Sequence, residues 1–349
     1  MPKLNVLHCH TTASDGVLSH EEVLREAAKY DIGTIAFTDH DTLIDPELFE
    51  KLKKEDGDID IISGIEVSAN YIAEVEGDIS LFHIIGLFVD PTNKKFLEYC
   101  ANAKAKRLER SSRLVANLSG IGFRVTVEEV LAQSEDGNIG RPHIVRALLA
   151  HPENLARIEE LMLEFKAAVE KSSESDPSFK EAYEATAASD AYGRVFGLVL
   201  DTRSFKKSIY VPYLHRLSMD EAVALIRGAG GIAILAHWSY IKKKLTPELL
   251  KKIAAEHRID GIESAYAFMS PEYDDGRGSD FAADREYIKE LNKEYHLAPG
   301  GGGDLHKPED FVRLTDPINV LMADDTRSFV SDIKKVFPDH PLLWSTLAD

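Results

Sequence analysis

The chain has 349 residues, 44% hydrophobic and 29% charged, which is the composition of an ordinary globular protein. Its 59 acidic residues outnumber its 41 basic ones and give a net charge of −18. A surface this acidic argues against binding long duplex nucleic acid through a broad basic face. Two cysteines exclude a disulfide framework, and there is no apolar run of membrane-spanning length. These features predict a cytoplasmic protein with no membrane association.

Strand-like and helical patterns alternate along residues 1–92. Ser19, followed by Glu21 and Glu22, predicts the capped start of a helix that runs to about residue 30. Alternation of this kind is typical of an α/β fold with largely parallel strands. The apolar runs that predict strands are residues 4–8, 33–38, 61–66 and 79–89.

Residues 93–207 have a different pattern, which predicts helices at 94–118, 126–133, 141–149 and 154–171 and an exposed loop at 171–178. We interpret this segment as a helical insertion, or cap, between two parts of one barrel, residues 1–92 and 208–349. In the second part the α/β pattern resumes. Strands are expected there at 232–237, 261–263 and 297–304, and helices at 218–227, 249–257 and 284–295.

Most of the candidate metal ligands share one position, at the carboxyl end of a strand-like run. In a parallel barrel the active site gathers at that end of the strands. His8 and His10 are two residues apart, so in an extended chain they point to the same side and can bind one ion, while Cys9 faces away as a buried thiol. Imidazole and carboxylate ligands suit zinc, manganese or iron. The candidates on this criterion are His8, His10, Asp39, His40, Glu66, His237, Asp304 and His306.

These residues resemble the motifs of the PHP (polymerase and histidinol phosphatase) superfamily. Residues 8–16 are similar to its opening His-x-His-Thr-x-x-Ser-Asp-Gly, and later motifs match in order at 38–41, 64–68, 140–143, 236–237 and 303–306. The resemblance spans roughly residues 4–306 and is strongest to the stand-alone metal-dependent phosphoesterases, which include nucleotide phosphatases and short-RNA exonucleases. It implies a distorted (β/α)7 barrel with a helical insertion and two to three divalent transition-metal ions (manganese, zinc or iron).

The resemblance also implies a ligand set. One ion would take His8, His10, Glu66 and Asp304; a second would take the bridging Glu66, His83 and His237; a third would take Asp15, His40 and His306. With three divalent ions bound, the site would carry a charge of about +3 inside an acidic protein, which favours capture of a phosphate ester.

We therefore expect hydrolysis of small phosphate esters, such as nucleotides or very short oligonucleotides, by a hydroxide that bridges the metals. Glu66 is expected to be catalytic as the bridge, and Asp39, beside ligand His40, by orienting a ligand or moving a proton. Arg141 and His143 open a predicted helix and are expected to bind the substrate phosphate, because an arginine fork and a helix N-terminus both favour anions.

Some residues depart from the resembled pattern. Val6 stands where many relatives have Asp, Trp238 replaces a proline and Lys307 a glycine, while residues 266–280 fit no motif. Trp238, Lys307 and this segment are expected near the rim of the pocket, so the resemblance does not determine the identity of the substrate. Two alternatives remain: hydrolysis of a non-phosphate bond by amidohydrolase-type chemistry, and a non-catalytic, metal-binding regulatory module.

Overall fold

The computed structural model describes residues 2–55, 58–75, 82–171, 177–213, 217–266, 278–317 and 319–341. The chain folds into two compact units, the first formed by Met1–Asn102 with Arg216–Asp349 and the second by Ala103–His215. No helix in the described ranges has the length and apolar character needed to cross a membrane. The insertion boundaries at 93 and 207 stay a prediction.

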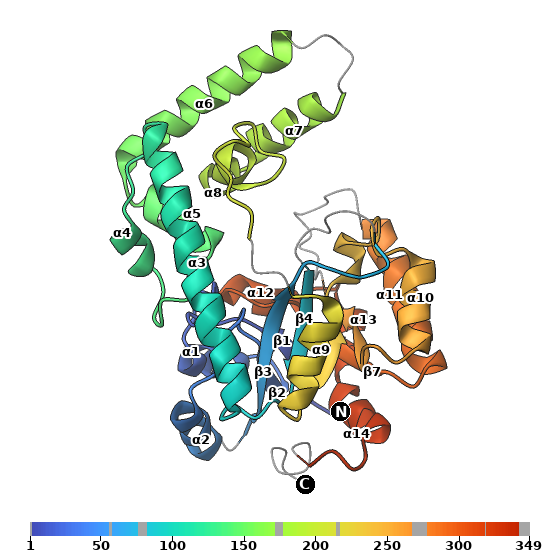
Figure 1. The fold of residues 1–349 in the computed structure, drawn as a ribbon. Coiled ribbons are helices and arrows are strands. Elements are labelled where there is room, and N and C mark those ends of the chain that lie inside the picture. The colour runs from blue at the N-terminus through green and yellow to red at the C-terminus, as the bar shows by residue number, and fades with distance from the viewer. Residues whose placement is uncertain are drawn as a thin grey trace. The chain divides into compact units, whose positions relative to one another are not determined.

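The first unit is built on a curled sheet of seven strands that follow one another in chain order (Figure 1). The strands are β1 (Leu4–Cys9), β2 (Ile32–Phe37), β3 (Asp60–Ala69), β4 (Phe82–Leu87), β5 (Ile232–Leu235), β6 (Gly261–Ala265) and β7 (Ala298–Gly301). Neighbouring strands are parallel except around β4, which is antiparallel to both β3 and β5. After β7 the chain returns to β1, where the His10 N–H donates to the Leu305 carbonyl at 2.8 Å. The predicted α/β barrel fold is confirmed, with one reversed strand that the sequence did not indicate.

Helices pack around this sheet, and the first begins where the sequence predicts a cap. Ser19 and Glu22 form a reciprocal capping box at the first helix, and Ser218 and Glu221 form another. The described residues after 306 form three short helices. The helical elements of the first unit are α1 (His20–Ala27), α2 (Pro46–Glu55), α9 (Met219–Gly228), the 3₁₀ helix η2 (Trp238–Tyr240), α10 (Pro247–Ala255), α11 (Gly278–Glu294), α12 (Pro308–Arg313), α13 (Val320–Thr326) and α14 (Phe329–Val336).

The second unit is helical and has a hydrophobic core of its own. Ile144, Leu161, Phe165 and Leu198 are buried in that core. The long helix α3 (Lys94–Gly120) begins in the first unit and continues into the second. The other helices are α4 (Val127–Leu131), α5 (Arg141–Leu149), α6 (Pro152–Lys171), α7 (Pro177–Ala188), α8 (Ala191–Val195) and the π-helix η1 (Phe196–Leu200). Residues 172–176 of the predicted polar loop lie outside the described residues.

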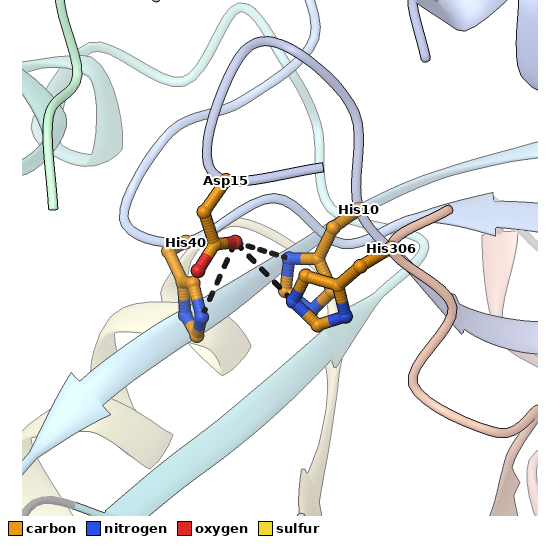
Figure 2. A group of neighbouring side chains, drawn as sticks. All are labelled: His10, Asp15, His40 and His306. Carbon is orange, nitrogen blue, oxygen red and sulfur yellow. Dashed lines mark ion pairs between the residues drawn. The ribbon is translucent and has the colours of Figure 1, made fainter. Parts of the chain in front are cut away.

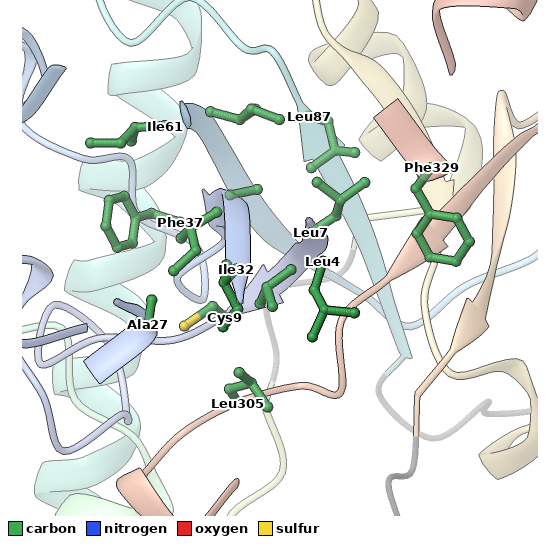
Figure 3. Packing of buried hydrophobic residues seen from close by; sticks show 14 of the residues in the cluster. Leu4, Leu7, Cys9, Ala27, Ile32, Phe37, Ile61, Leu87, Leu305 and Phe329 are labelled. Carbon is green, nitrogen blue, oxygen red and sulfur yellow. The ribbon is translucent and has the colours of Figure 1, made fainter. Parts of the chain in front are cut away.

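The core of the first unit explains the facing of β1. Leu7 and Cys9 pack with Ile32 and Phe37 in one buried cluster (Figure 3). Because side chains alternate along a strand, His8 points to the opposite side from Leu7 and Cys9. The expected facing of the His8–His10 pair therefore follows from the hydrophobic residues that flank it.

Candidate metal centre

The predicted ligands gather at one edge of the sheet. His8 lies in β1, and His40 and His237 follow the ends of β2 and β5. His83 is the second residue of β4, and because that strand is antiparallel, its beginning lies at the edge where its neighbours end. Glu66 lies within β3 rather than at its end, where the sequence placed it.

Glu66 is the centre of the cluster. Its Oε1 lies 2.9 Å from His83 Nδ1 and 3.0 Å from His237 Nε2, and its Oε2 lies 2.8 Å from His40 Nδ1. The Glu66 residue is only 1% exposed. A carboxylate whose two oxygens face different groups of imidazoles has the arrangement that a bridging ligand requires.

A second group surrounds Asp304. Its Oδ1 lies 3.2 Å from His8 Nε2 and 3.1 Å from His10 Nε2. Asp304 has a backbone φ of 56°, in the left-handed region, where residues other than glycine are uncommon. This turn after β7 directs the carboxylate toward the end of β1.

Asp15 is the centre of a third group, shown in Figure 2. Its Oδ1 lies 3.3 Å from His306 Nε2, 3.8 Å from His40 Nε2 and 3.7 Å from His10 Nδ1. The four residues satisfy the spacing of a metal-binding group. The structure thus brings together all nine side chains that the sequence singled out as ligands.

Glu263 is a member of the site that the sequence reasoning missed. This carboxylate in β6 is fully buried; its Oε1 lies 2.8 Å from His8 Nδ1, and its Oε2 accepts the backbone N–H of His237 at 2.7 Å. The available signal was an acidic residue at the carboxyl end of a predicted strand, the same criterion that identified the other candidates.

The contact with Glu263 tests whether a cation fits the cluster. A proton on His8 Nδ1 that is donated to Glu263 leaves a lone pair on Nε2 of the neutral ring. That atom faces Asp304 Oδ1 at 3.2 Å and His10 Nε2 at 3.2 Å. Lone pairs of nitrogen and oxygen that converge in this way, with a second carboxylate orienting the ring, are the donor set of a transition-metal site.

The pKa shifts in the cluster also indicate that its carboxylates favour a positive charge among them. Burial lowers the pKa of His10, but Asp304 and Glu66 outweigh it and raise that pKa to about 10. Burial would raise the pKa of Glu66, but His83, His40 and His8 hold it well below its usual range. The carboxylates are therefore ionised at neutral pH and available to a metal ion.

Asp39, predicted to be catalytic, is buried beside the cluster. Its Oδ1 accepts the Thr11 N–H at 2.7 Å and the Ser14 hydroxyl at 2.6 Å, and its Oδ2 accepts the Thr11 hydroxyl at 2.8 Å. Ser14 Oγ lies in turn 3.3 Å from His10 Nδ1. These contacts tie Asp39 to the loop that carries Asp15.

Arg141 and His143, the predicted phosphate-binding residues, belong to the second unit. Both lie in the first turn of α5, where His143 is buried and its Nδ1 accepts the N–H of Gly140 at 3.0 Å. The Arg141 guanidinium lies 3.5 Å from Asp201 and is near Arg110. Burial lowers the pKa of Arg110 to about 10, with Arg141 contributing to that shift.

Of the residues expected at the pocket rim, Trp238 has another position, and the place of Lys307 at the rim stays a prediction. Trp238 is 1% exposed, and its indole Nε1 donates to the Leu245 carbonyl at 2.7 Å, so it is a core residue and the expectation was wrong. Lys307 is the N-cap residue of α12. Residues 267–277, most of the segment that matches no motif, lie outside the described residues.

The sheet, with its His/Asp/Glu cluster, defines the class of protein to which the chain belongs. The PHP domain family matches residues 7–258, and the chain belongs to that family. It is 28% identical over 324 residues to a 5'-3' exoribonuclease of Haemophilus influenzae, covering 92% of this chain and 96% of that protein. A 3',5'-nucleoside bisphosphate phosphatase of Chromobacterium violaceum is 24% identical, with 89% and 94% covered. A solved structure of a candidate metal-dependent phosphoesterase from Bifidobacterium adolescentis matches with a TM-score of 0.60 and 27% identity, covering 88% of this chain and 89% of that one.

Proposed function

We propose that the protein is a metal-dependent phosphoesterase that hydrolyses small phosphate esters, such as nucleotides or very short oligonucleotides. The observation that carries this proposal is the convergence of nine histidine and carboxylate side chains with Glu66 at their centre, where its nearest imidazoles lie at 2.8 to 3.0 Å. The family relatives described above are named for cleaving phosphate esters, which supports this substrate class over an amide or a lactone.

Two to three divalent transition-metal ions would be held by this set. His8, His10, Glu66 and Asp304 would hold one; Glu66, His83 and His237 a second; and Asp15, His40 and His306 a third. When bound, the ions lower the pKa of water, so that a nucleophile forms near neutral pH, and they stabilise charge on the phosphoryl oxygens. With a net charge of −18, the protein as a whole repels anions, so positive charge at the site favours capture of a phosphate ester.

The protein's own residues orient this set and hold the substrate. Glu263 fixes the His8 ring through a contact of 2.8 Å, and Asp39 fixes the loop that carries Asp15. Arg141 binds a phosphate oxygen through its fork of N–H donors. Its nearness to Arg110 supports this role, because grouped guanidinium charges favour an anion.

Metal analysis combined with a substrate panel tests the proposal. Protein purified without chelators should contain two to three transition-metal ions per chain, and it should hydrolyse nucleotides or dinucleotides after loading with manganese, zinc or iron. The panel should include amides and lactones as the matched test of amidohydrolase chemistry. Less than one bound ion per chain after loading, or turnover of amides and lactones alone, would overturn the proposal. Metal binding without turnover of any substrate would favour the regulatory module.

A further inference from the structure

A largely exposed aromatic side chain stands beside the metal centre. Tyr240 ends the 3₁₀ helix η2 that follows His237, and 54% of its surface is exposed. The centroid of its ring lies 5.6 Å from that of His237, with 49° between the two planes. His237 Nε2 in turn lies 3.0 Å from Glu66. One ligand ring therefore separates Tyr240 from the centre of the cluster.

Two buried aromatic rings pack against the ring of Tyr240. Tyr266, 1% exposed, meets its ring at 6.3 Å and 64°, and Phe281, also buried, meets it at 5.8 Å and 80°. Both contacts have the edge-to-face geometry that aromatic pairs prefer. The support fixes the Tyr240 ring while much of its surface stays accessible.

Polar contacts hold the same turn in place. The Ser239 hydroxyl donates to Asp284 at 2.5 Å and also contacts the Tyr266 hydroxyl, while Lys242 Nζ lies 2.9 Å from Asp284. Tyr240 thus lies on a turn fixed by a buried tryptophan before it and this network around it. A ring fixed in this way loses little conformational freedom when a ligand stacks on it.

We propose that Tyr240 is a stacking platform for the nucleobase of the substrate, so that the enzyme selects nucleotides and short oligonucleotides over sugar phosphates. This inference rests on the proposed phosphoesterase function. A phosphate at the metal centre places its sugar and base within reach of a ring that borders a ligand histidine. Every base has a flat π-face, so stacking on tyrosine selects for a base without selecting its sequence. None of the proposed metal-binding roles requires an exposed tyrosine at this position.

Adenosine 5'-monophosphate and ribose 5-phosphate form a matched pair for the test, because they share the sugar phosphate and differ in the base. Metal-loaded wild-type protein should prefer the nucleotide. Tyr240→Ala should lower kcat/KM for the nucleotide roughly 5- to 150-fold, mainly through KM, and leave ribose 5-phosphate unchanged. Tyr240→Phe keeps the ring and should retain the preference. Tyr295→Ala, which removes a half-buried tyrosine that contacts Lys251 elsewhere in this unit, is the control.

Two results would overturn the inference while the phosphoesterase function stands: equal losses of Tyr240→Ala on both substrates, or a Tyr240→Phe variant as impaired as Tyr240→Ala. If adenosine 5'-monophosphate binds without being cleaved, its inhibition constant is measured against a dinucleotide substrate and used in place of KM. The same comparisons between the variants then test the inference. Absence of phosphate-ester hydrolysis by the wild-type protein would refute the proposed function itself.

Discussion

Replacement of Asp39 by asparagine separates a positioning role from proton transfer. The Asp39 residue is 2% exposed and accepts three hydrogen bonds, from the Thr11 N–H, the Thr11 hydroxyl and the Ser14 hydroxyl, at 2.6 to 2.8 Å. Asn keeps the size and one acceptor oxygen but removes the negative charge. The variant therefore tests whether a charged acceptor is needed to hold this loop.

The expected loss follows from those three contacts. A hydrogen bond to a charged group contributes roughly 1.5–3 kcal/mol, against about 0.5–1.5 kcal/mol for a neutral one. Asn can retain part of each interaction, so Asp39→Asn should lower the free energy of unfolding by roughly 2–4 kcal/mol. Urea unfolding of the metal-free protein, followed by circular dichroism and extrapolated linearly, measures this difference.

The loss should extend to the metal centre through the loop. This loop carries Asp15, and its Ser14 hydroxyl lies 3.3 Å from His10 Nδ1. Asp39→Asn should therefore lose metal first from the Asp15, His40 and His306 group, which elemental analysis after graded chelation would show as a lower metal content.

Asp41 offers a matched control two residues along the chain. It is also buried and accepts three hydrogen bonds, from the Ser68 N–H, the Ser68 hydroxyl and the Tyr99 hydroxyl, at 2.5 to 2.8 Å. Asp41→Asn should lower stability to a similar extent and leave the metal content unchanged. If Asp39→Asn instead keeps its stability and its metals while turnover falls a thousandfold, Asp39 moves a proton and the positioning argument is wrong.

The remaining predictions concern the metal centre and the substrate. Glu66→Gln should remove the bridge and lower turnover by several orders of magnitude while the chain still folds; near-normal turnover would show that Glu66 is not the bridge. Glu263→Gln should weaken metal affinity about 10- to 100-fold, measured by chelator competition, whereas Asp260→Asn, just before β6 and paired with Arg227, should change stability alone; equal affinity losses would reject the proposed role of Glu263. Arg141→Ala should lower kcat/KM for phosphate esters about 10- to 100-fold, since a contact to a charged group contributes roughly 1.5–3 kcal/mol, with an unchanged metal content; a loss of metal would instead make Arg141 structural. Because the pKa of His10 is raised to about 10, a metal ion must displace the proton of His10, so metal affinity should rise from pH 7 toward pH 10. Calorimetry in buffers of different ionisation enthalpy measures proton release on metal binding, and finding none would contradict this prediction.

The sequence by itself determined the features that depend on local pattern. Alternation of buried and ligand side chains placed His8 and His10 on one side of β1, and the Ser19–Glu22 pair marked the start of α1. The resemblance to the PHP superfamily supplied the nine predicted ligands that the structure brings together. Such features are readable because they are set within a few residues of the chain.

Only the tertiary structure decided which distant side chains meet and in which direction strands run. A strand pattern identifies faces but carries no direction, so the antiparallel course of β4 that brings His83 to the site was not predictable from its apolar run. Glu263 contacts His8 across 255 positions of sequence, and Tyr240 owes its orientation to Tyr266 and Phe281. These contacts arise because the sheet closes and α11 packs against β6. Both events bring together side chains that are far apart in the sequence, so no single segment of the chain predicts the contacts.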